Sequence, residues 1–201
     1  MKNKSIAFGL LIIFFALLMT GCVITFSGIE GNGRIVKEER FVDQFDGLVL
    51  EGVGNVNIHS AGYYKAVVTT DSNLQDLISV KVKNNILYID EKNSTGFNPT
   101  KLTIDVYLPE LKSVGLRGVG NIDIYDGYTS DLEISLSGVG NIDAQDYQVQ
   151  RADITLSGTG KIKVWATNSL RGSLSGVGDI LYRGNPANYV RISGVGTVKK
   201  M

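Results

Sequence analysis

A seven-residue phrase recurs six times in this chain, and it restricts the possible folds more than any other feature. Each copy has a hydrophobe, a polar or charged residue, Gly, Val or Thr, Gly, another polar or charged residue, and then Ile or Val. From the second copy onward, the first glycines are 20, 20, 18 and 18 residues apart. Because a repeat of this length cannot bury its apolar side alone, the copies are expected to stack on one another. The glycines of the phrases are Gly52, Gly54, Gly118, Gly120, Gly138, Gly140, Gly158, Gly160, Gly176, Gly178, Gly194 and Gly196.

Alternation of apolar and polar residues around each phrase predicts β-strands with one buried face. In residues 134–144, every apolar residue except Val139 has an even number, and Ser, Asn and Asp have odd numbers. Matching positions in stacked windings would lie about 4.8 Å apart. Two internal columns of aliphatic side chains are therefore predicted: Leu116, Leu136, Leu156, Leu174 and Ile192 in one, and Ile122, Ile142, Ile162, Ile180 and Val198 in the other.

The Gly-Val-Gly centre of the phrase leaves two interpretations open. By the same alternation both glycines face the interior, where they allow either a close approach of another segment or a positive φ angle. If a glycine acts as a β-bulge, the intervening valine is buried; otherwise the valines form an exposed apolar stripe. Because such stripes are costly on a soluble surface, burial or partial burial is the prediction, and an exposed stripe would be a contact surface. These valines are Val53, Val119, Val139, Val177 and Val195.

These patterns predict an all-β fold, a single-stranded parallel β-helix (β-solenoid) that is right-handed and has coils of 18–20 residues. No segment after residue 110 has a helical pattern. The long interval between Gly52 and Gly118 lacks the phrase and is expected to form a modified N-terminal part, which also caps the stack. We expect strands at 64–70 and 101–108, a short helical turn at 72–78, and a hairpin of 79–83 and 86–91 around Asn84-Asn85. Turns are expected at Asp126-Gly127, Arg171-Gly172 and 184–186.

The N-terminal segment has the features of a secretory signal that ends in a lipidation site. Two lysines precede an apolar run at 6–18, and Thr-Gly-Cys follows, with Cys22 as the only cysteine of the chain. This ending is similar to a bacterial lipobox, in which the cysteine carries the lipid, although Met19 stands where leucine is usual. The alternative is an uncleaved membrane anchor, since 6–26 is nearly long enough to span a bilayer. The predicted division is a signal peptide at 1–21, a tether at 22–40 and a β-solenoid domain at 41–201.

The charge balance excludes one class of partner. The chain has 20 Lys and Arg against 20 Asp and Glu, and loss of residues 1–21 removes two lysines and no acid. The remaining net charge is about −2, whereas binding of nucleic acid requires a clustered basic face. No nucleic-acid partner is therefore expected. No motif indicates a cofactor, and a single cysteine cannot form a disulfide within the chain.

The six phrases, with the Phe45-Asp46-Gly47-Leu48 segment before the first, resemble the bacterial autotransporter adhesin head domains, a family named after its Gly-Ile-Asn motif. The resemblance covers about residues 40–198. It implies a secreted or lipid-anchored envelope protein with a parallel β-helical fold. It supplies no catalytic residues. We expect the lipid anchor to hold this protein at the outer membrane or the cell surface.

Outward-facing aromatic side chains indicate where such a module would bind. Tyr125 and Trp165 share one outward column, with Gln145 between them, and Tyr128 and Tyr147 lie near the neighbouring turns. Exposed aromatic rings beside Asp and Asn suit a glycan-binding platform, although rings at such positions also shield turns. Tyr125 and Trp165 are therefore candidate binding residues for a glycan.

Two acids form the other candidate feature, because Asp123 is expected to stack on Asp143 in the next winding. Like charges this close repel one another unless solvent or a cation such as calcium separates them. Only two of the six copies have an acid at this position, so a solvated surface is expected and no metal site is predicted. Both acids remain candidate binding residues.

The sequence thus predicts a lipid-anchored interaction module of the cell envelope, adhesin-like, that binds a glycan or an envelope protein without catalysis. The alternative is a polysaccharide-active enzyme, a lyase or glycosidase, for which Asp123 and Asp143 fit only by their spacing. His59 is the sole histidine and is expected on the surface. An activity borrowed from a fold is analogy alone. The serines between the windings (Ser137, Ser157, Ser175 and Ser193) have no base beside them and are expected to hydrogen-bond along the stack. No oligomeric state follows from the sequence.

Overall fold

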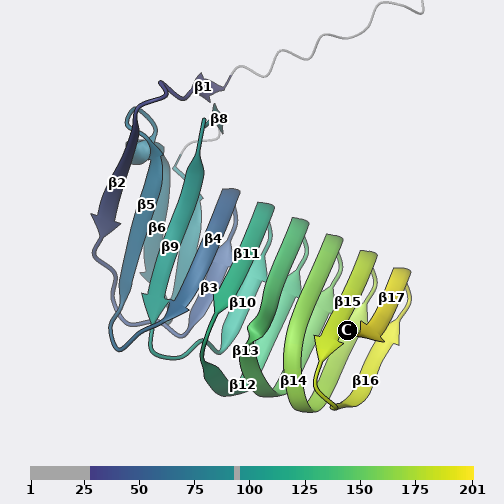
Figure 1. Ribbon diagram of the computed structural model, residues 1–201. Coiled ribbons are helices and arrows are strands. Elements are labelled where there is room, and N and C mark those ends of the chain that lie inside the picture. Colours follow the sequence, from purple (N-terminus) through teal and green to yellow (C-terminus); the bar gives the residue numbers. More distant parts are fainter. Residues whose placement is uncertain (1–27, 93–95) are drawn as a thin grey trace, which may run out of the picture.

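The computed structural model describes residues 28–92 and 96–201, and the chain in these ranges is mostly β-strand (Figure 1). The predicted all-β class is confirmed. No helix in these ranges is long and apolar enough to cross a membrane. The predicted signal peptide, the lipidation site Cys22 and the start of the predicted tether lie outside the described residues.

Fifteen of the described strands form one sheet, and β1 (Ile29–Glu30) and β8 (Phe97–Asn98) form a second, two-stranded sheet. A 3-10 turn, η1 (Gln75–Leu77), lies between β5 and β6. In chain order the strands of the large sheet are β2 (Ile35–Arg40), β3 (Gly47–Leu50), β4 (Val53–Ser60), β5 (Lys65–Asp71), β6 (Ile78–Lys83), β7 (Ile86–Glu91), β9 (Leu102–Leu108), β10 (Ser113–Leu116), β11 (Val119–Tyr125), β12 (Tyr128–Leu136), β13 (Val139–Leu156), β14 (Thr159–Leu174), β15 (Val177–Arg183), β16 (Ala187–Ile192) and β17 (Val195–Lys200).

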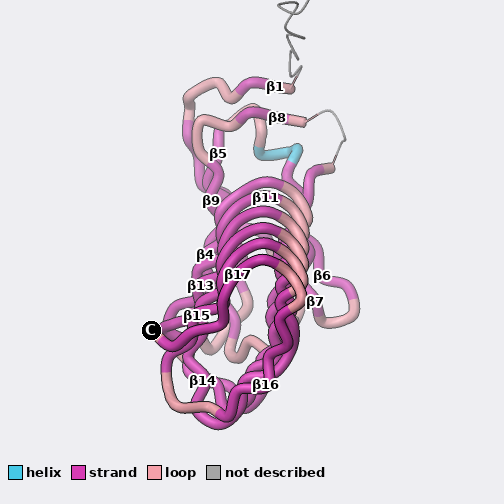
Figure 2. The backbone as a smooth tube through the Cα atoms, turned by 90° about the vertical axis from the view of Figure 1, so that its right-hand side faces the viewer, coloured by secondary structure: helices cyan, strands magenta, loops and turns pink. Residues whose placement is uncertain are grey.

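Successive copies of the phrase lie side by side as parallel strands and build two walls. The first wall runs β3, β10, β12, then the second halves of β13 and β14, then β16. The second wall runs β4, β11, then the first halves of β13 and β14, then β15 and β17. Each phrase carries the chain from the first wall to the second. Seen along the stack, the sheet nearly closes around an oval core (Figure 2).

The strand register confirms the two predicted columns of aliphatic side chains. Leu136 lies opposite Leu116 on one side and Leu156 on the other. Ile142 occupies the equivalent place in the second column. Burying one such side chain stabilises the fold by roughly 1.5–3 kcal/mol. The columns are completely buried except at their last members, and Ile192 is 51% exposed.

The longest strands pass through positions where a turn was expected. β13 has 18 residues and β14 has 16, so each bends from one wall to the other without interruption. The turn predicted at Arg171-Gly172 is therefore wrong. Gly172 instead allows two windings to pack closely, because a Cβ there would lie 1.9 Å from the carbonyl oxygen of Ile154 in the preceding winding. The turns predicted at Asp126-Gly127 and at 184–186 do separate strands.

From the second copy onward, the glycines of the phrase face the backbone of the preceding winding rather than the interior, which corrects the prediction from alternation. A Cβ on Gly138 would lie 2.0 Å from the carbonyl oxygen of Gly118. A Cβ on Gly140 would lie 1.7 Å from that of Gly120, and Gly140 also has a φ of 141°. Close approach of the backbones therefore excludes side chains at both positions, and the second position adds an unfavourable φ.

The N-terminal part is a mixed sheet and not a purely parallel β-helix. β2 pairs antiparallel with β5, and β5 with β9, before β9 joins β4 in parallel. β6 and β7 form the predicted hairpin, and Asn84 and Asn85 have φ angles of 52° and 61°, as a tight turn requires. β7 then pairs in parallel with β3. This part covers one end of the stack (Figure 1).

Residues 35–40, predicted to belong to the tether, form β2 instead. All six pair with β5. The buried Gln75 reinforces the pairing, because its Nε2 donates hydrogen bonds to the carbonyl oxygens of Val36 and Val68, both at 3.1 Å. The sheet therefore begins before the predicted domain boundary at residue 41. The charged composition of this segment concealed its strand.

The buried Asp71 fixes the segment that precedes β2. Its carboxylate accepts hydrogen bonds from the backbone N–H of Gly33 (2.7 Å) and from the backbone N–H and hydroxyl of Thr100 (2.9 and 2.7 Å). Burial alone would raise the pKa of Asp71, but these hydrogen bonds outweigh it, so the pKa lies below the ordinary value of 3.8. A charged carboxylate thus holds the chain where it approaches the predicted anchor.

Candidate functional site

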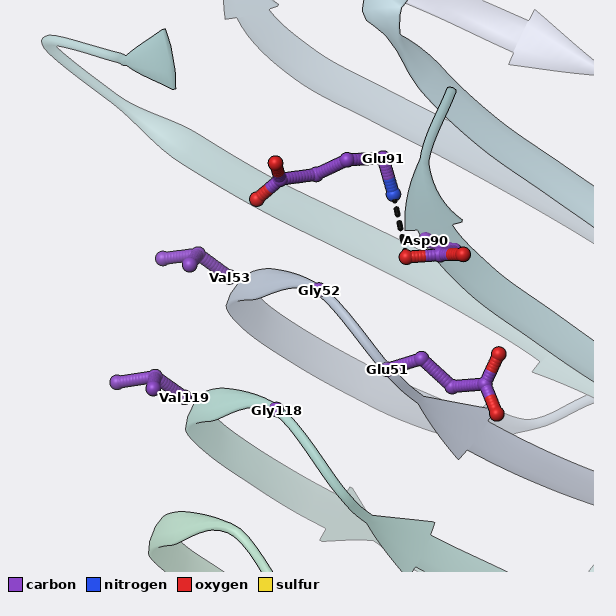
Figure 3. Close-up of a pocket in the computed structure, with 7 residues that line it drawn as sticks. All are labelled: Glu51, Gly52, Val53, Asp90, Glu91, Gly118 and Val119. Carbon is purple, nitrogen blue, oxygen red and sulfur yellow. Dashed lines mark hydrogen bonds between the residues drawn. The ribbon is translucent and has the colours of Figure 1, made fainter. Parts of the chain in front are cut away.

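The valines of the phrases are exposed, so the predicted burial is wrong. The valine ridge, defined as Val53, Val119, Val139, Val177 and Val195, has exposed fractions from 46% at Val53 to 70% at Val195. Val53 and Val119 lie one above the other and point away from the windings (Figure 3). The backbone reaches this arrangement because the glycines relieve the bend between the walls without reversing the alternation.

A shallow hollow of about 350 Å³ lies beside the start of the ridge, and Glu51, Asp90 and Glu91 are among the residues that line it (Figure 3). Burial, and then the neighbouring charge of Asp90, raise the pKa of Glu91. Glu51 is already paired with Arg117 at 2.9 Å. No lysine, arginine or histidine is among the residues that line the hollow. The lining residues offer no acid-base pair, and the counter-charge beside them, Arg117, is already engaged by Glu51, so we assign the hollow no function.

The outer face of the second wall carries a row of amides. Asn121 Nδ2 donates a hydrogen bond to Asn55 Oδ1 at 3.0 Å, and Asn141 Nδ2 donates to Asn121 Oδ1 at 2.9 Å. Lys161 follows at the same register position in the next winding. Within the described residues, the side-chain oxygen of Asn141 and the side-chain N–H groups of Asn55 have no other hydrogen-bond partner. Both ends of the row can therefore hydrogen-bond a ligand.

The two predicted acids lie beside this row in adjacent windings, as expected. Asp123 is directly opposite Asp143, and Lys163 is opposite Asp143 on the far side. Lys163 Nζ pairs with Asp143 Oδ2 at 2.7 Å. Burial, and then the Asp143 charge, raise the pKa of Asp123, while Lys163 opposes the shift. A lysine of this chain, which the sequence analysis did not consider, thus balances the pair.

Together the two rows form a shallow polar groove of about 330 Å³. It offers amide and ammonium donors beside amide and carboxylate acceptors, all on rigid strands. No cluster of three or more His, Cys, Asp and Glu side chains among the described residues is arranged to hold a metal ion. The lining residues of the polar groove are Asn55, Asn121, Asp123, Asn141, Ile142, Asp143, Lys161 and Lys163.

Tyr125 is the last ring of an aromatic column that the sequence analysis missed. Its ring stacks on His59 with the centroids 5.1 Å apart, and His59 stacks on Tyr107 at 5.0 Å. Tyr63 completes the column at 5.8 Å from Tyr107. Most ring faces are therefore covered by other rings, and Tyr125, 39% exposed, is the member nearest the acids of the groove. Aligning the first two phrases would have placed His59 beside Tyr125, but Tyr107 lies outside any copy.

Trp165 does not share a column with Tyr125, which corrects the predicted platform. A register shift between Ala144 and Gln148 places Trp165 opposite Gln148 and not opposite Gln145. The guanidinium of Arg183 lies 4.3 Å from the centre of the tryptophan ring and covers one of its faces. Of the four candidate binding residues, the structure brings together Asp123, Asp143 and Tyr125, whereas Trp165 lies in the register column of Gln148 and Tyr128.

Tyr147 and the serines of the phrases also differ from expectation. Tyr147, expected near an exposed turn, is 1% exposed, and its hydroxyl accepts a hydrogen bond from the Leu111 N–H at 3.0 Å. Its burial raises its pKa. The exposed serines make no hydrogen bonds to one another in the described ranges; instead the Ser157 N–H, for example, donates to the Leu136 carbonyl at 2.9 Å.

This chain is similar to known proteins, both to a family and to solved structures. A family model described as "Putative auto-transporter adhesin, head GIN domain" matches residues 44–126 and 117–186, more than half of the chain. No curated protein is significantly similar. The chain resembles the crystal structure of a "putative adhesin" from Bacteroides fragilis with 23% identity and a TM-score of 0.60, over 87% of this chain and 100% of that one.

Two further solved structures are more distant. A "putative adhesin" from Parabacteroides merdae has 19% identity and a TM-score of 0.44, over 87% of this chain and 99% of that one. A "putative lipid binding protein" from Parabacteroides distasonis has 22% identity and a TM-score of 0.39, over 86% and 99%. The Bacteroides structure supports the fold, and the family match extends across both walls. The chain therefore belongs to the auto-transporter adhesin head GIN domain family.

Proposed function

We propose that this protein is an adhesin-like binding module of the cell envelope, a β-solenoid that binds glycans through the polar groove. One observation carries the proposal: the groove places paired hydrogen-bond donors and acceptors on rigid neighbouring strands, with Tyr125 near its acids. Membership of the adhesin head family supports a location at the cell surface or envelope. We further propose that the predicted lipid at Cys22 anchors it there.

The chemistry of the groove favours a hydroxyl-rich ligand. A sugar hydroxyl both donates and accepts hydrogen bonds, so it can bridge an Asn amide and a neighbouring carboxylate. Asp123 has no hydrogen-bond partner among the described residues and is free to accept from such a hydroxyl. A glycan can run along the stack over several windings, because the amide position repeats at Asn55, Asn121 and Asn141 in adjacent windings about 4.8 Å apart.

We propose no catalytic role for the groove. A glycosidase needs one carboxylic acid and one free carboxylate placed on either side of the bond to be cleaved. Asp123 and Asp143 instead lie side by side on one flat face, and Asp143 is occupied by Lys163. This arrangement suits binding.

The experiment is a panel of envelope and host oligosaccharides tested against the full-length protein in detergent, by calorimetry. The variant Asp123→Ala is expected to lower the affinity for the best ligand by about tenfold, which corresponds to the loss of one charge-assisted hydrogen bond. Ser175→Ala, an exposed residue outside the groove, is the matched control and should leave the affinity unchanged. Failure of every glycan to bind, or an equal loss in both variants, would contradict the proposal.

A further inference from the structure

The stack is closed at one end and open at the other. The mixed sheet of β2, β5, β6 and β9 covers the N-terminal end. At the other end β16 pairs only with β14, and β17 only with β15. The last members of the aliphatic columns are correspondingly uncovered: Ile192 is 51% exposed, and Val198 is only partly buried. An apolar cross-section of the core therefore faces outward here.

β17 presents free backbone hydrogen-bonding groups along this open end. The N–H groups of Val195 and Met201 donate to Gly176 and Tyr182 of the preceding windings. Since successive residues of a strand point their backbone groups to opposite sides, the N–H and C=O of Gly196, Val198 and Lys200 point outward. On β16 the equivalent edge is partly closed, because the Val190 N–H donates to the side chain of Asn188 at 3.0 Å. β17 is thus the available edge at this end of the stack.

The side chains at this edge are basic. Lys199 and Lys200 lie on β17 and Arg191 on β16, and all three are exposed. None of them has an ion-pair partner among the described residues. The nearby acid, Asp179, is engaged by the Thr197 hydroxyl at 2.7 Å and by its N–H at 3.0 Å. Asp179 keeps its negative charge and interacts with Lys199, but three cations near one anion leave the edge with a net positive charge beside an apolar surface.

We propose that β17 accepts an added strand from a partner protein, an extended segment in which apolar and acidic side chains alternate. Its backbone would pair with the free groups of Gly196, Val198 and Lys200, as in other cases of strand addition. Its apolar side chains would lie on the inner face, beside Val198 and Ile192, and its acids on the outer face, beside Lys199. This surface differs from the polar groove and extends the proposed function to a protein partner.

The same lysines disfavour a second copy of this chain as the occupant. Two β17 edges brought together would place several like charges close to one another, which opposes pairing. Lysine on an exposed edge is a common means by which proteins prevent self-association. An acidic strand would instead be attracted by these lysines, so the charge of the edge favours an acidic partner over a second copy of this chain.

Two synthetic peptides test the proposal with the full-length protein in detergent: one alternates valine and glutamate, the other valine and lysine. By fluorescence anisotropy, the glutamate peptide should bind at least about tenfold more tightly than the lysine peptide, and added salt should weaken its binding. In the double variant K199E/K200E the preference should reverse. The control K81E/K83E makes the same charge change on β6 and should preserve it. Equal binding of the two peptides, or a reversal in the control, would overturn the proposal.

A second pair of variants separates strand addition from simple charge attraction. Lys200→Gln removes the charge alone, and Lys200→Pro also removes the outward N–H. The proline variant should bind the glutamate peptide several-fold more weakly than the glutamine variant, with an unchanged melting temperature. Equal binding by the two variants would rule out strand addition. Dimerisation of the unmodified protein that Lys200→Pro abolishes would assign the edge to a second copy and also overturn the proposal.

Discussion

Replacing Gly140 by alanine is expected to lower the free energy of unfolding by about 4 kcal/mol. The added methyl carbon would lie 1.7 Å from the carbonyl oxygen of Gly120, which belongs to the backbone of the neighbouring winding and cannot rotate away. The φ of 141° adds strain for any residue with a side chain. For a domain of this size the melting temperature should fall by about 8–16 °C. Circular dichroism during heating measures the change.

Gly62→Ala is the matched control for this substitution. A Cβ on Gly62 meets no atom within 4 Å, so the same chemical change should alter stability by no more than about 0.5 kcal/mol. If Gly140→Ala were as mild as Gly62→Ala, the two windings could not lie as close as the structure places them.

Leu156→Ala is expected to destabilise the protein by about 3 kcal/mol, because it removes a completely buried side chain from the middle of a column. Ile192→Ala makes a similar deletion at the end of the same column, where the side chain is 51% exposed. The free energy of unfolding of Ile192→Ala should fall by less than about 1 kcal/mol. Denaturant titration with a common m-value provides the comparison.

The difference between these two variants is the informative quantity. Leu174 is the neighbour of both residues in the column: it lies opposite Leu156 on one side and opposite Ile192 on the other. Only Leu156 has a further winding beyond it, at Leu136. Equal losses would mean that the end of the stack is as well covered as its middle, contrary to the open edge described above.

Much of the architecture was predictable because one phrase repeats in register. The spacing of Leu116, Leu136 and Leu156 alone requires parallel neighbours, and strand pairing gives that result. The hairpin at Asn84-Asn85 was equally clear, because two residues that tolerate positive φ separate two alternating segments. The pairing of β2 with β5 was not predictable, since a charged segment such as 35–40 gives no sign of which strand it will join.

The candidate site was predicted less well, and β-bulges are the reason. The positions of Asp123 and Asp143 follow from the repeat. The neighbour of Trp165 depends on a register shift in β13, for which the sequence gives no signal. Three residues of β13 between Ala144 and Gln148 have no partner on β14, so the residue beside Trp165 is Gln148 rather than Gln145. The exposure of the valine ridge was mispredicted for the opposite reason: a bulge was assumed at the glycines, whereas the valines and the flanking aliphatic side chains keep their alternation.

Cross-linking of paired cysteines tests most directly that the windings lie on one another in register. In a Cys22→Ser background, Asn121→Cys with Asn141→Cys places two thiols where the amides are now 2.9 Å apart, although 20 residues separate them in sequence. Adjacent strands about 4.8 Å apart lie within the Cα range of a disulfide, so mild oxidation should join the pair rapidly. Asn121→Cys with Lys161→Cys, two windings apart, should remain unlinked. Rapid linkage of the second pair, or none in the first, would contradict the stacked arrangement.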